Sequence, residues 1–427
     1  MTYDHVTPYD RFALTDVDVE GLLVTGGHRN ELIDYFGATE YRELTQLARR
    51  AARKDVTDES LHVILVPGIM GSQLGLVRNP PVPNDILWVD PIDISVGRLA
   101  SLRLPGAAPI VPLGVVLYSY LKLKLHLRAA GFAVSFHDYD WRLGVDELGR
   151  SFAQRLRDEP AKRLAIVAHS MGGLVSRAAA VLPGAERVER ILLLGSPNCG
   201  SFATVQALRG TYSVVRKLAR IAADSSAESL AGEVFNTFPS LYHMLPDATC
   251  ADGTDLFDSQ VWPRSGPRPD PTLLAHARTL QSTLAQPDER FAAIVGVGQE
   301  TVTAVRQRGD DFIYTVTRHG DGTVPAISAA FPGAPTHYAP VAHSDLTRDK
   351  LVAAAVIDLL RKGSTRRLPT RWKTRSRARA QISDRQLRRT HAQKVEWAAL
   401  QPEERRIFLQ ELNEPPKLKL RVPASRK

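Results

Sequence analysis

The chain has 427 residues, of which 44% are apolar, and it carries a formal net charge of +9. This length and composition are those of a globular protein with a large core, and they exclude an intrinsically disordered chain. The sequence offers no apolar run long enough to span a bilayer, no secretory signal, no set of cysteines for a disulfide framework and no cysteine–histidine cluster with zinc spacing. We therefore expect a cytoplasmic protein in which Cys199 and Cys250 are small buried residues.

The first 56 residues are interpreted as an N-terminal helical extension, with an irregular start and one helix over residues 29–53. Residues 61–66 are a short, fully apolar run that predicts the first strand of the core and ends at a Pro-Gly turn. A long Pro-rich loop region follows over residues 79–112. Helix and strand then alternate, with a helix at 115–130, a strand at 133–136, a helix around 152–156, and strands at 164–167 and 191–194.

Regular alternation stops at residues 199–288, where helix-like and turn-rich stretches replace strands, and we interpret this region as a mostly helical cap or lid. Strand character resumes at 291–295 and 312–316, and residues 346–361 predict the last core helix. Strands that alternate with helices at this spacing indicate an α/β fold, with a mainly parallel sheet and helices on both faces.

The positive charge is concentrated near the C-terminal end. Residues 361–427 hold 20 Lys and Arg against 6 Asp and Glu, which leaves residues 1–360 with a net charge of −5. Residues 361–391 are rich in arginine and poor in apolar residues, which predicts a solvated or partly disordered arm. A Pro-Glu-Glu sequence at 402–404 then opens a short amphipathic helix that carries Ile407, Phe408 and Leu412.

These observations divide the chain into five parts. They are the helical extension (1–56), the first part of the core (57–198), the cap insertion (199–288), the second part of the core (289–362) and the basic tail (363–427). Three roles are open for the tail, namely peripheral contact with anionic membranes, nonspecific attraction of nucleic acid, and a solubilising extension.

The pentapeptide 168–172, Ala-His-Ser-Met-Gly, lies between a strand-like run and a helix-like run. A strand that turns into a helix through small-x-Ser-x-Gly is typical of the nucleophile elbow of serine hydrolases, where small residues relieve crowding around a strained serine. We therefore predict that Ser170 is a nucleophile. The alternative is an ordinary strand-to-helix turn in which the serine caps the helix.

An acyl-transferring serine needs a base and an orienting carboxylate, and in α/β-hydrolases the chain order is serine, acid, histidine. Asp321 lies between two glycines in a loop after a strand, and Asp310 and Asp311 are weaker rivals. His343 lies directly before the final helix, whereas His337 lies within a strand-like run, where a structural role is expected. We predict Asp321 as the acid and His343 as the base.

Two further parts of a site follow from the elbow. The N–H of Met171, the residue after the nucleophile, and an N–H from the loop after the first strand are expected to form the oxyanion hole. In that loop, residues 66–72, the flanking glycines make the Ile69 N–H the candidate. Trp88 lies in the Pro-rich loop region, either in a lid that dips into lipid or packed over the core.

With these residues in place, the chain resembles the lecithin:cholesterol acyltransferase and phospholipid:diacylglycerol acyltransferase family. The resemblance rests on four blocks: Val-Pro-Gly-Ile-Met-Gly-Ser-Gln-Leu at 66–74, Tyr-Asp-Trp-Arg-Leu at 139–143, the elbow, and Gly-Asp-Gly-Thr-Val-Pro at 320–325. It implies the α/β-hydrolase fold with a cap, activity on acyl esters of lipids, and a triad of Ser170, Asp321 and His343. The second block is expected to brace the loops around the site through Asp140 and Arg142.

The prediction is a serine-dependent lipid O-acyltransferase or acyl hydrolase that needs no metal or organic cofactor. One alternative is a carboxylesterase for small soluble esters. Another is a catalytically silent protein whose basic tail binds membrane or nucleic acid. A lipid-active enzyme favours the membrane over nucleic acid as the partner of the tail.

Overall fold

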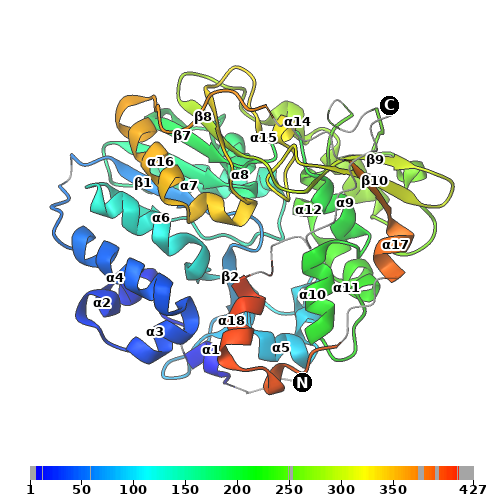
Figure 1. The fold of residues 1–427 in the computed structure, drawn as a ribbon, viewed down its shortest axis with the longest axis horizontal. Coiled ribbons are helices and arrows are strands. Elements are labelled where there is room, and N and C mark those ends of the chain that lie inside the picture. Colours follow the sequence, from blue (N-terminus) through cyan, green and yellow to red (C-terminus); the bar gives the residue numbers. More distant parts are fainter. Residues whose placement is uncertain are drawn as a thin grey trace, which may run out of the picture.

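The computed structural model describes residues 6–11, 13–57, 59–248, 250, 253–373, 379–389, 394–410 and 412. Its centre is a six-stranded sheet with the order β11-β8-β7-β6-β1-β5, in which every neighbouring pair is parallel (Figure 1). The strands are β1 (His62–Val66), β5 (Ala133–Phe136), β6 (Leu164–His169), β7 (Val188–Leu194), β8 (Phe291–Gly296) and β11 (Thr336–Ala339).

Helices cover both faces of this sheet. On one face, Val63 and Leu65 of β1 share a buried cluster with α6 (Leu117–Ala129) and α16 (Lys350–Lys362). On the other face, Ile64 packs in the cluster that includes α7 (Val145–Asp158) and α8 (Met171–Ala179). Because successive strand residues point to opposite faces, a strand buried on both sides reads as the continuous apolar run seen in the sequence. The predicted α/β-hydrolase fold, a mainly parallel sheet between two helical layers, is confirmed.

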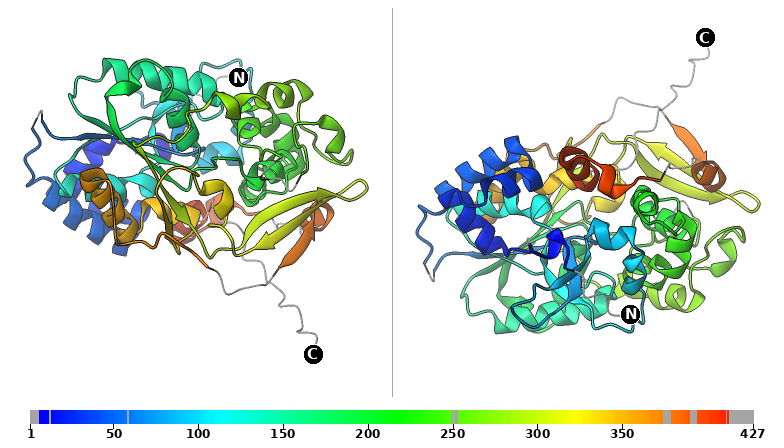
Figure 2. Two further views of the ribbon diagram at one scale, coloured as in Figure 1. Left: turned by 90° about the horizontal axis from the view of Figure 1, so that it is seen from above. Right: turned by 90° about the horizontal axis from the view of Figure 1, so that it is seen from below.

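A set of helices follows β7 and precedes β8, and it lies to one side of the sheet (Figures 1 and 2). Its members are α9 (Phe202–Leu208), α10 (Ser213–Ile221), α11 (Ala227–Glu233), α12 (Pro239–His243), α13 (Pro271–Ala277) and α14 (Leu280–Thr283), with 3₁₀ turns at Phe235–Thr237 and Ser259–Val261. The described part of this region contains no strand. Its apolar faces join the core cluster of α7 and α8, so this helical layer is continuous with the core.

The region from 79 to 112, predicted as a Pro-rich loop, is in part regular structure. It contributes β3 (Asp85–Trp88), α5 (Pro91–Ser95), a 3₁₀ helix at Arg98–Leu102 and the start of β4 (Val111–Val115). With β2 (Ser72–Leu76) these strands form an antiparallel sheet in the order β3-β2-β4. The prediction of a loop was wrong because such short strands are stabilised by pairing with β2, which a local pattern does not reveal.

A second small sheet, in the order β12-β10-β9, is antiparallel and contains β9 (Thr301–Gln307) and β10 (Phe312–Thr317). Its third strand, β12 (Ala380–Ser383), comes from the arginine-rich segment and leads into α17 (Asp384–Arg389). The prediction of a solvated or partly disordered arm is therefore wrong for residues 379–389, whereas residues 374–378, 390 and 391 lie outside the described residues.

One buried ion pair fixes this segment. Arg209, at the end of α9, donates to Asp384 at 2.6 Å, and both side chains are at most 1% exposed. The same guanidinium also donates to the carbonyl oxygen of Pro263 at 3.1 Å. The arginine-rich segment is thus held in place by the Asp384 carboxylate, which pairs with the Arg209 guanidinium from the helices after β7.

The N-terminal part forms α1 (Pro8–Arg11), α2 (Asp16–Thr25), α3 (Arg29–Phe36) and α4 (Ala38–Ala51). The predicted helix over 29–53 is interrupted at Gly37, whose φ of +85° is outside the helical region. Helix α1 lies against β3. Helices α2, α3 and α4 share a buried cluster with α6, where Lys122 pairs with Glu43 at 2.6 Å and Lys124 pairs with Glu20 at 2.6 Å. Figure 1 shows them beside α6, opposite the helices that follow β7.

The short helix predicted near residue 402 is α18 (Pro402–Gln410), preceded by a 3₁₀ turn at Trp397–Ala399. It lies against α3, and the Tyr118 hydroxyl of α6 donates to the carbonyl oxygen of Leu409 at 3.0 Å. Figure 2 shows α18 between the N-terminal helices and the helices after β7. The boundaries of the five parts of the chain remain a prediction.

Cys199 and Cys250 are joined by a disulfide, with their Cα atoms 6.4 Å apart. The prediction that they are two separate small buried residues was wrong, because the fold brings together two sulfurs at a sequence separation of 51. The expectation of a cytoplasmic protein relied in part on unpaired cysteines and loses that support. In the described part of the chain, no helix combines the length and apolar character needed to cross a membrane.

Candidate active site

Ser170 lies at the sharp turn between β6 and α8, with φ 55° and ψ −127°. This positive φ is strained for a residue with a side chain, and the backbone N–H is held by a 2.9 Å bond to the carbonyl oxygen of Leu194. Its hydroxyl does not cap α8, which removes the alternative reading of this serine. A Cβ at Gly172 would lie 2.4 Å from the carbonyl oxygen of Pro67, so the glycine two residues on is a steric necessity.

Asp321 follows β10 in a tight loop and is 1% exposed. Its Oδ1 accepts backbone N–H bonds from Thr323 at 2.9 Å and Val324 at 2.7 Å, so this oxygen is fully occupied and the carboxylate cannot rotate. Its Oδ2 is thereby aimed at the neighbouring loop. A Cβ at Gly296 would come within 2.6 Å of the Asp321 Cβ, which shows how closely β8 approaches the aspartate.

His343 opens the 3₁₀ helix His343–Thr347 before α16. Its Nδ1 lies 2.8 Å from Asp321 Oδ2, and its Nε2 lies 2.9 Å from Ser170 Oγ. Since the carboxylate only accepts, Nδ1 carries the proton, and Nε2 is left to accept the hydroxyl proton of the serine. The backbone N–H of His343 also donates to the carbonyl oxygen of Asp321 at 2.9 Å, which locks the two loops together.

The rival residues lie elsewhere. Asp310 is engaged by the backbone N–H groups of Arg264 and Ser265. Asp311 accepts from the Arg385 backbone N–H. His337 is buried within β11, where a structural role was expected. Of the predicted residues, the structure brings together Ser170, Asp321 and His343, which come from loops that follow three different strands.

The loop after β1 lies over the serine. A Cβ at Gly68 would be 2.7 Å from the Cβ of Ser170, so only glycine permits this approach. Within the described part of the chain, the N–H groups of Ile69 and Met171 have no hydrogen-bond acceptor. Met171 is the first residue of α8, so its N–H belongs to the positive end of the helix dipole. Both predicted oxyanion donors are therefore available beside Ser170.

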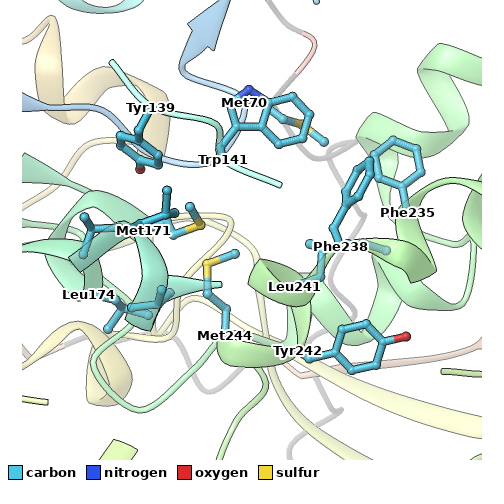
Figure 3. Packing of buried hydrophobic residues seen from close by; sticks show 14 of the residues in the cluster. Met70, Tyr139, Trp141, Met171, Leu174, Phe235, Phe238, Leu241, Tyr242 and Met244 are labelled. Carbon is cyan, nitrogen blue, oxygen red and sulfur yellow. The ribbon is translucent and has the colours of Figure 1, made fainter. Parts of the chain in front are cut away.

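Aromatic side chains hold the backbone of that loop. The Tyr139 hydroxyl donates to the carbonyl oxygen of Pro67 at 2.6 Å, and the Trp141 indole N–H donates to that of Ser72 at 3.0 Å. Figure 3 shows Tyr139 and Trp141 with Met70, and Met171 facing the helical layer after β7. Each ring thus adds apolar packing and one polar contact with the loop.

Trp88 belongs to the same group. The expectation that it lies in a lid facing lipid was wrong: the side chain is 2% exposed, and its indole N–H donates to the carbonyl oxygen of Met70 at 2.9 Å. Its ring packs edge to face with Trp141 at 5.4 Å. Pairing of β3 with β2 carries the residue under the loop, which matches the alternative of a residue packed over the core.

The predicted bracing role of the second block is confirmed. Arg142 forms a two-pronged ion pair with Asp140, at 2.8 and 2.6 Å, and donates to the carbonyl oxygen of Leu102 at 2.9 Å. Both residues are buried. The pair therefore ties the loop after β5 to the segment that follows β3.

A cavity of about 90 Å³ opens beside Ser170. It lies between the loop of residues 66–72 (the oxyanion loop), α6 and the helices after β7. None of the described residues that line it is Asp, Glu, Lys or Arg. Several lining hydroxyls donate to backbone carbonyl oxygens, as Ser201 does to Thr323 at 2.6 Å and Thr347 does to Ser119 at 2.7 Å. Ala203, Ala207, Val215, Leu241 and Met244 form an apolar wall. The cavity suits an uncharged, apolar group.

One group of side chains in the described part of the chain is close enough to hold a metal ion. The one cluster of His, Cys, Asp or Glu side chains close enough to hold an ion is Cys199, Asp247 and Cys250, and the disulfide engages both of its sulfurs.

Two residues beside the serine were missed by the sequence reasoning. The Tyr120 hydroxyl of α6 accepts the Gly68 N–H at 2.9 Å and lies 3.1 Å from Nδ1 of His169. His169 was visible inside the elbow pentapeptide as a polar residue at the end of a buried strand, which was a usable signal. Tyr120 offered none, because its partner lies 52 residues away.

Comparison with known proteins adds one family match. The model of the PGAP1-like alpha/beta domain matches residues 151–240, less than half of the chain, and this segment includes Ser170. No curated protein matches the chain. Membership of the lecithin:cholesterol acyltransferase and phospholipid:diacylglycerol acyltransferase family remains a prediction.

Among solved structures, the mature lipase BlEst2 of Bacillus licheniformis is 13% identical, with a TM-score of 0.38 over 73% of this chain and 95% of that one. Phospholipase PlaB of Legionella pneumophila is 12% identical, with a TM-score of 0.34 over 72% of this chain and 61% of that one. The Staphylococcus hyicus lipase is 13% identical, with a TM-score of 0.32 over 72% and 96%. At these values, the three structures carry no information on the substrate of this chain.

Proposed function

We propose that the protein is a serine-dependent acyl hydrolase or O-acyltransferase that acts on acyl esters of lipids through an acyl-Ser170 intermediate. The observation that carries the proposal is the continuous pair of hydrogen bonds from Ser170 through His343 to Asp321, at 2.9 and 2.8 Å. This arrangement of nucleophile, base and orienting carboxylate is the one that acyl transfer requires.

In the first half of the reaction, Ser170 Oγ attacks the ester carbonyl carbon while Nε2 of His343 takes the hydroxyl proton. The carbonyl electron pair moves onto oxygen and then returns, which breaks the bond to the leaving alcohol, and Nε2 gives that alcohol its proton. In the second half, water or an acceptor alcohol attacks the acyl-serine and loses its proton to Nε2, and Ser170 leaves with that proton. Asp321 stays ionised and holds the imidazole in the required tautomer.

The N–H groups of Ile69 and Met171 would bind the oxygen that becomes negative in each tetrahedral intermediate. Among the described residues neither N–H has another acceptor, and the two come from the loop over the serine and from a helix N-terminus. In comparable enzymes each such donor stabilises the transition state by about 3–4 kcal/mol.

The cavity supports an uncharged acyl group as the bound part of the substrate. Among the described residues its lining contains no Asp, Glu, Lys or Arg, and an unpaired charge placed there would lose its hydration without compensation. The resemblance to acyltransferases of lipids supports a lipid ester as the substrate.

A second candidate, a carboxylesterase for small esters, is favoured by the size of the cavity. A space of about 90 Å³ is smaller than the roughly 150 Å³ cavity that accommodates benzene in an engineered protein core. Long acyl chains would require the helices after β7 to move. Rates for p-nitrophenyl esters with acyl chains from acetate to palmitate separate the two candidates, because a lipid enzyme prefers the long chains and a small-ester enzyme rejects them.

Covalent labelling tests the nucleophile. A fluorophosphonate probe should label the wild type and spare Ser170→Ala. Ser176→Ala is the matched control, because this buried serine lies on α8, directly after the elbow, and its hydroxyl donates to the carbonyl oxygen of Gly172. Equal labelling of wild type and Ser170→Ala would remove Ser170 from the mechanism.

The acceptor is identified by the products. Mass spectrometry after incubation with mixed phospholipids and acylglycerols, with and without an added sterol or alcohol, distinguishes free fatty acids from new esters. New esters indicate an acyltransferase, and free fatty acids alone indicate a hydrolase.

The tail remains a candidate for contact with anionic membranes. The described parts of residues 379–410 pack on the body, so the charges to test are the lysines and arginines at 417–427. Replacing those five residues by glutamine should lower sedimentation with phosphatidylserine vesicles and leave ester turnover in solution unchanged.

A further inference from the structure

Tyr120 and His169 connect the loop over the serine to the loop that carries His343. The Gly68 N–H donates to the Tyr120 hydroxyl oxygen at 2.9 Å, and this hydroxyl lies 3.1 Å from His169 Nδ1. The other ring nitrogen of His169, Nε2, lies 3.0 Å from the backbone carbonyl oxygen of His343. Tyr120 is 5% exposed and His169 is 8% exposed, so water does not compete freely for these bonds.

The direction of each hydrogen bond follows from its partners. A carbonyl oxygen only accepts, so His169 Nε2 carries the proton and donates to His343. His169 Nδ1 is then an acceptor, and the Tyr120 hydroxyl must donate to it. Burial and the nearby His343 hold the pKa of His169 well below its usual range, which keeps this ring neutral. The bonds thus form one polarised chain from Gly68 to His343.

We propose that Tyr120 and His169 are positioning residues for acyl transfer. They hold the oxyanion loop and the loop that carries His343 at one fixed spacing about Ser170. This inference rests on the proposed function of the site. Neither residue exchanges a proton with the substrate. Tyr120 occupies the Gly68 N–H, so the next N–H of the loop, that of Ile69, is left to face the oxyanion. His169 holds the backbone carbonyl of His343, whose N–H is held by the carbonyl oxygen of Asp321.

The packing around the hydroxyl gives it little freedom to move. A Cβ at Gly71 would lie 2.7 Å from the Tyr120 hydroxyl oxygen, so the turn of residues 68–71 closes directly on it. The rings of His169 and His343 are 4.7 Å apart, and those of Tyr120 and His169 are 5.9 Å apart. A shift of the loop would therefore be transmitted to the imidazole that accepts the Ser170 proton.

Tyr120→Phe is the first test, because it removes only the hydroxyl. We expect kcat for a soluble p-nitrophenyl ester to fall about 10- to 100-fold, since a displacement of about 1 Å in the reacting groups costs on the order of 100-fold. KM should change less than about twofold, because the loss falls on the transition state and not on the bound substrate.

Tyr242→Phe is the matched control. The Tyr242 hydroxyl also accepts a backbone N–H, from Asp270 at 2.8 Å, and also donates, to the carbonyl oxygen of Asn236 at 2.8 Å. It is buried in the helical layer after β7 and does not line the cavity. Both variants should lose similar stability in urea unfolding, but Tyr242→Phe should keep the wild-type kcat. Equal kcat values for the wild type and Tyr120→Phe would overturn the inference.

Substitutions of His169 separate the two ends of the chain of bonds. Asparagine places an acceptor near Nδ1 and keeps the link to Tyr120, and glutamine places an N–H near Nε2 and keeps the link to His343, whereas leucine keeps neither. We expect His169→Asn and His169→Gln to retain kcat values between those of the wild type and His169→Leu. If the residues act as a unit, Tyr120→Phe combined with His169→Leu costs no more than His169→Leu alone.

Failure of this inference is distinguishable from failure of the proposed function. A wild type without ester turnover and without fluorophosphonate labelling at Ser170 contradicts the proposed function. An active wild type with His169→Leu at wild-type kcat contradicts only the positioning role. Should Tyr120→Phe fail to fold, the His169 series decides the question.

Discussion

The indole N–H of Trp88 donates to the carbonyl oxygen of Met70 at 2.9 Å, and this bond fixes the loop that carries Ile69, whose N–H is the proposed oxyanion donor. Trp88→Phe leaves the carbonyl oxygen without its donor, so we expect a loss of about 1–3 kcal/mol in the free energy of unfolding. The kcat for a soluble ester and for an emulsified lipid should fall by the same factor.

Trp262→Phe is the control for that substitution, since its buried indole donates to the carbonyl oxygen of Leu256, also at 2.9 Å, in the helical layer after β7. It should cost similar stability without the loss of kcat. A Trp88→Phe enzyme impaired only on the emulsion would contradict the support role and restore a role at the lipid interface.

Asp321→Asn should lower kcat by roughly 10³- to 10⁴-fold. The two backbone N–H groups that bind Oδ1 will select the amide oxygen for that position, so the amide NH₂ faces His343 Nδ1. An N–H cannot accept from Nδ1, and the imidazole is driven to the tautomer that cannot take the serine proton.

Asp349→Asn is a fitting control, because Asp349 also accepts two backbone N–H bonds, from Leu351 and Val352, and has no histidine partner among the described residues. Steady-state kinetics of both variants provide the measurement. A kcat of Asp321→Asn within tenfold of the wild-type kcat would rule out the orienting role of Asp321.

The disulfide between Cys199 and Cys250 closes a loop with a sequence separation of 51. In the chain-entropy description, a loop of this length corresponds to about 4 kcal/mol of stability. The double substitution of both cysteines by serine should lower the free energy of unfolding by up to that amount. Urea unfolding with and without a thiol reductant is the measurement: the wild type should be weakened by the reductant, and the double variant should not respond to it. If the reductant frees both cysteines of the wild type and its free energy of unfolding stays the same, the prediction is refuted.

Asp90 should make stability depend on pH. Its side chain is fully buried at the N-terminus of α5, where it accepts from the N–H groups of Ile92 and Asp93 and from the Thr7 hydroxyl. Burial raises the pKa of Asp90 from 3.8 to about 7. The folded state therefore holds a proton that the unfolded chain releases between these values, so the contribution of Asp90 is complete below pH 4 and is lost as pH rises to about 7.

Asp90→Asn removes that dependence. The difference in unfolding free energy between wild type and variant should decrease as pH rises from 4 to 7 and stay constant above it. Urea unfolding of both proteins at pH 4, 5.5, 7 and 8 provides the comparison. A difference that is the same at all four values would show that Asp90 titrates alike in the folded and unfolded chains.

The central sheet and the three site residues could be predicted because their signals are local. Each core strand is a short apolar run, and parallel strands bring the loops at their carboxyl ends to one edge of the sheet. Ser170 and His343 follow the parallel strands β6 and β11, and the two glycines that flank Asp321 marked its loop after β10 of the antiparallel sheet, so each position had a local signal.

The remainder depends on contacts between distant segments. The pairing of β12 with β10 is decided by Arg209, whose partner Asp384 is 175 residues away, and the local sequence around β12 resembles a solvated arm. The Tyr120 hydroxyl reaches Gly68 only because α6 packs on the oxyanion loop. No periodicity or motif within either segment carries that information, which arises when the two surfaces meet.

The docking of α18 on the N-terminal helices has a consequence for synthesis. Gln410 bonds to the carbonyl oxygen of Phe36 across 374 residues. At roughly 5–20 residues per second, a ribosome adds Gln410 on the order of 20–75 s after Phe36. During that interval the surface of α3 against which α18 packs stays uncovered by α18.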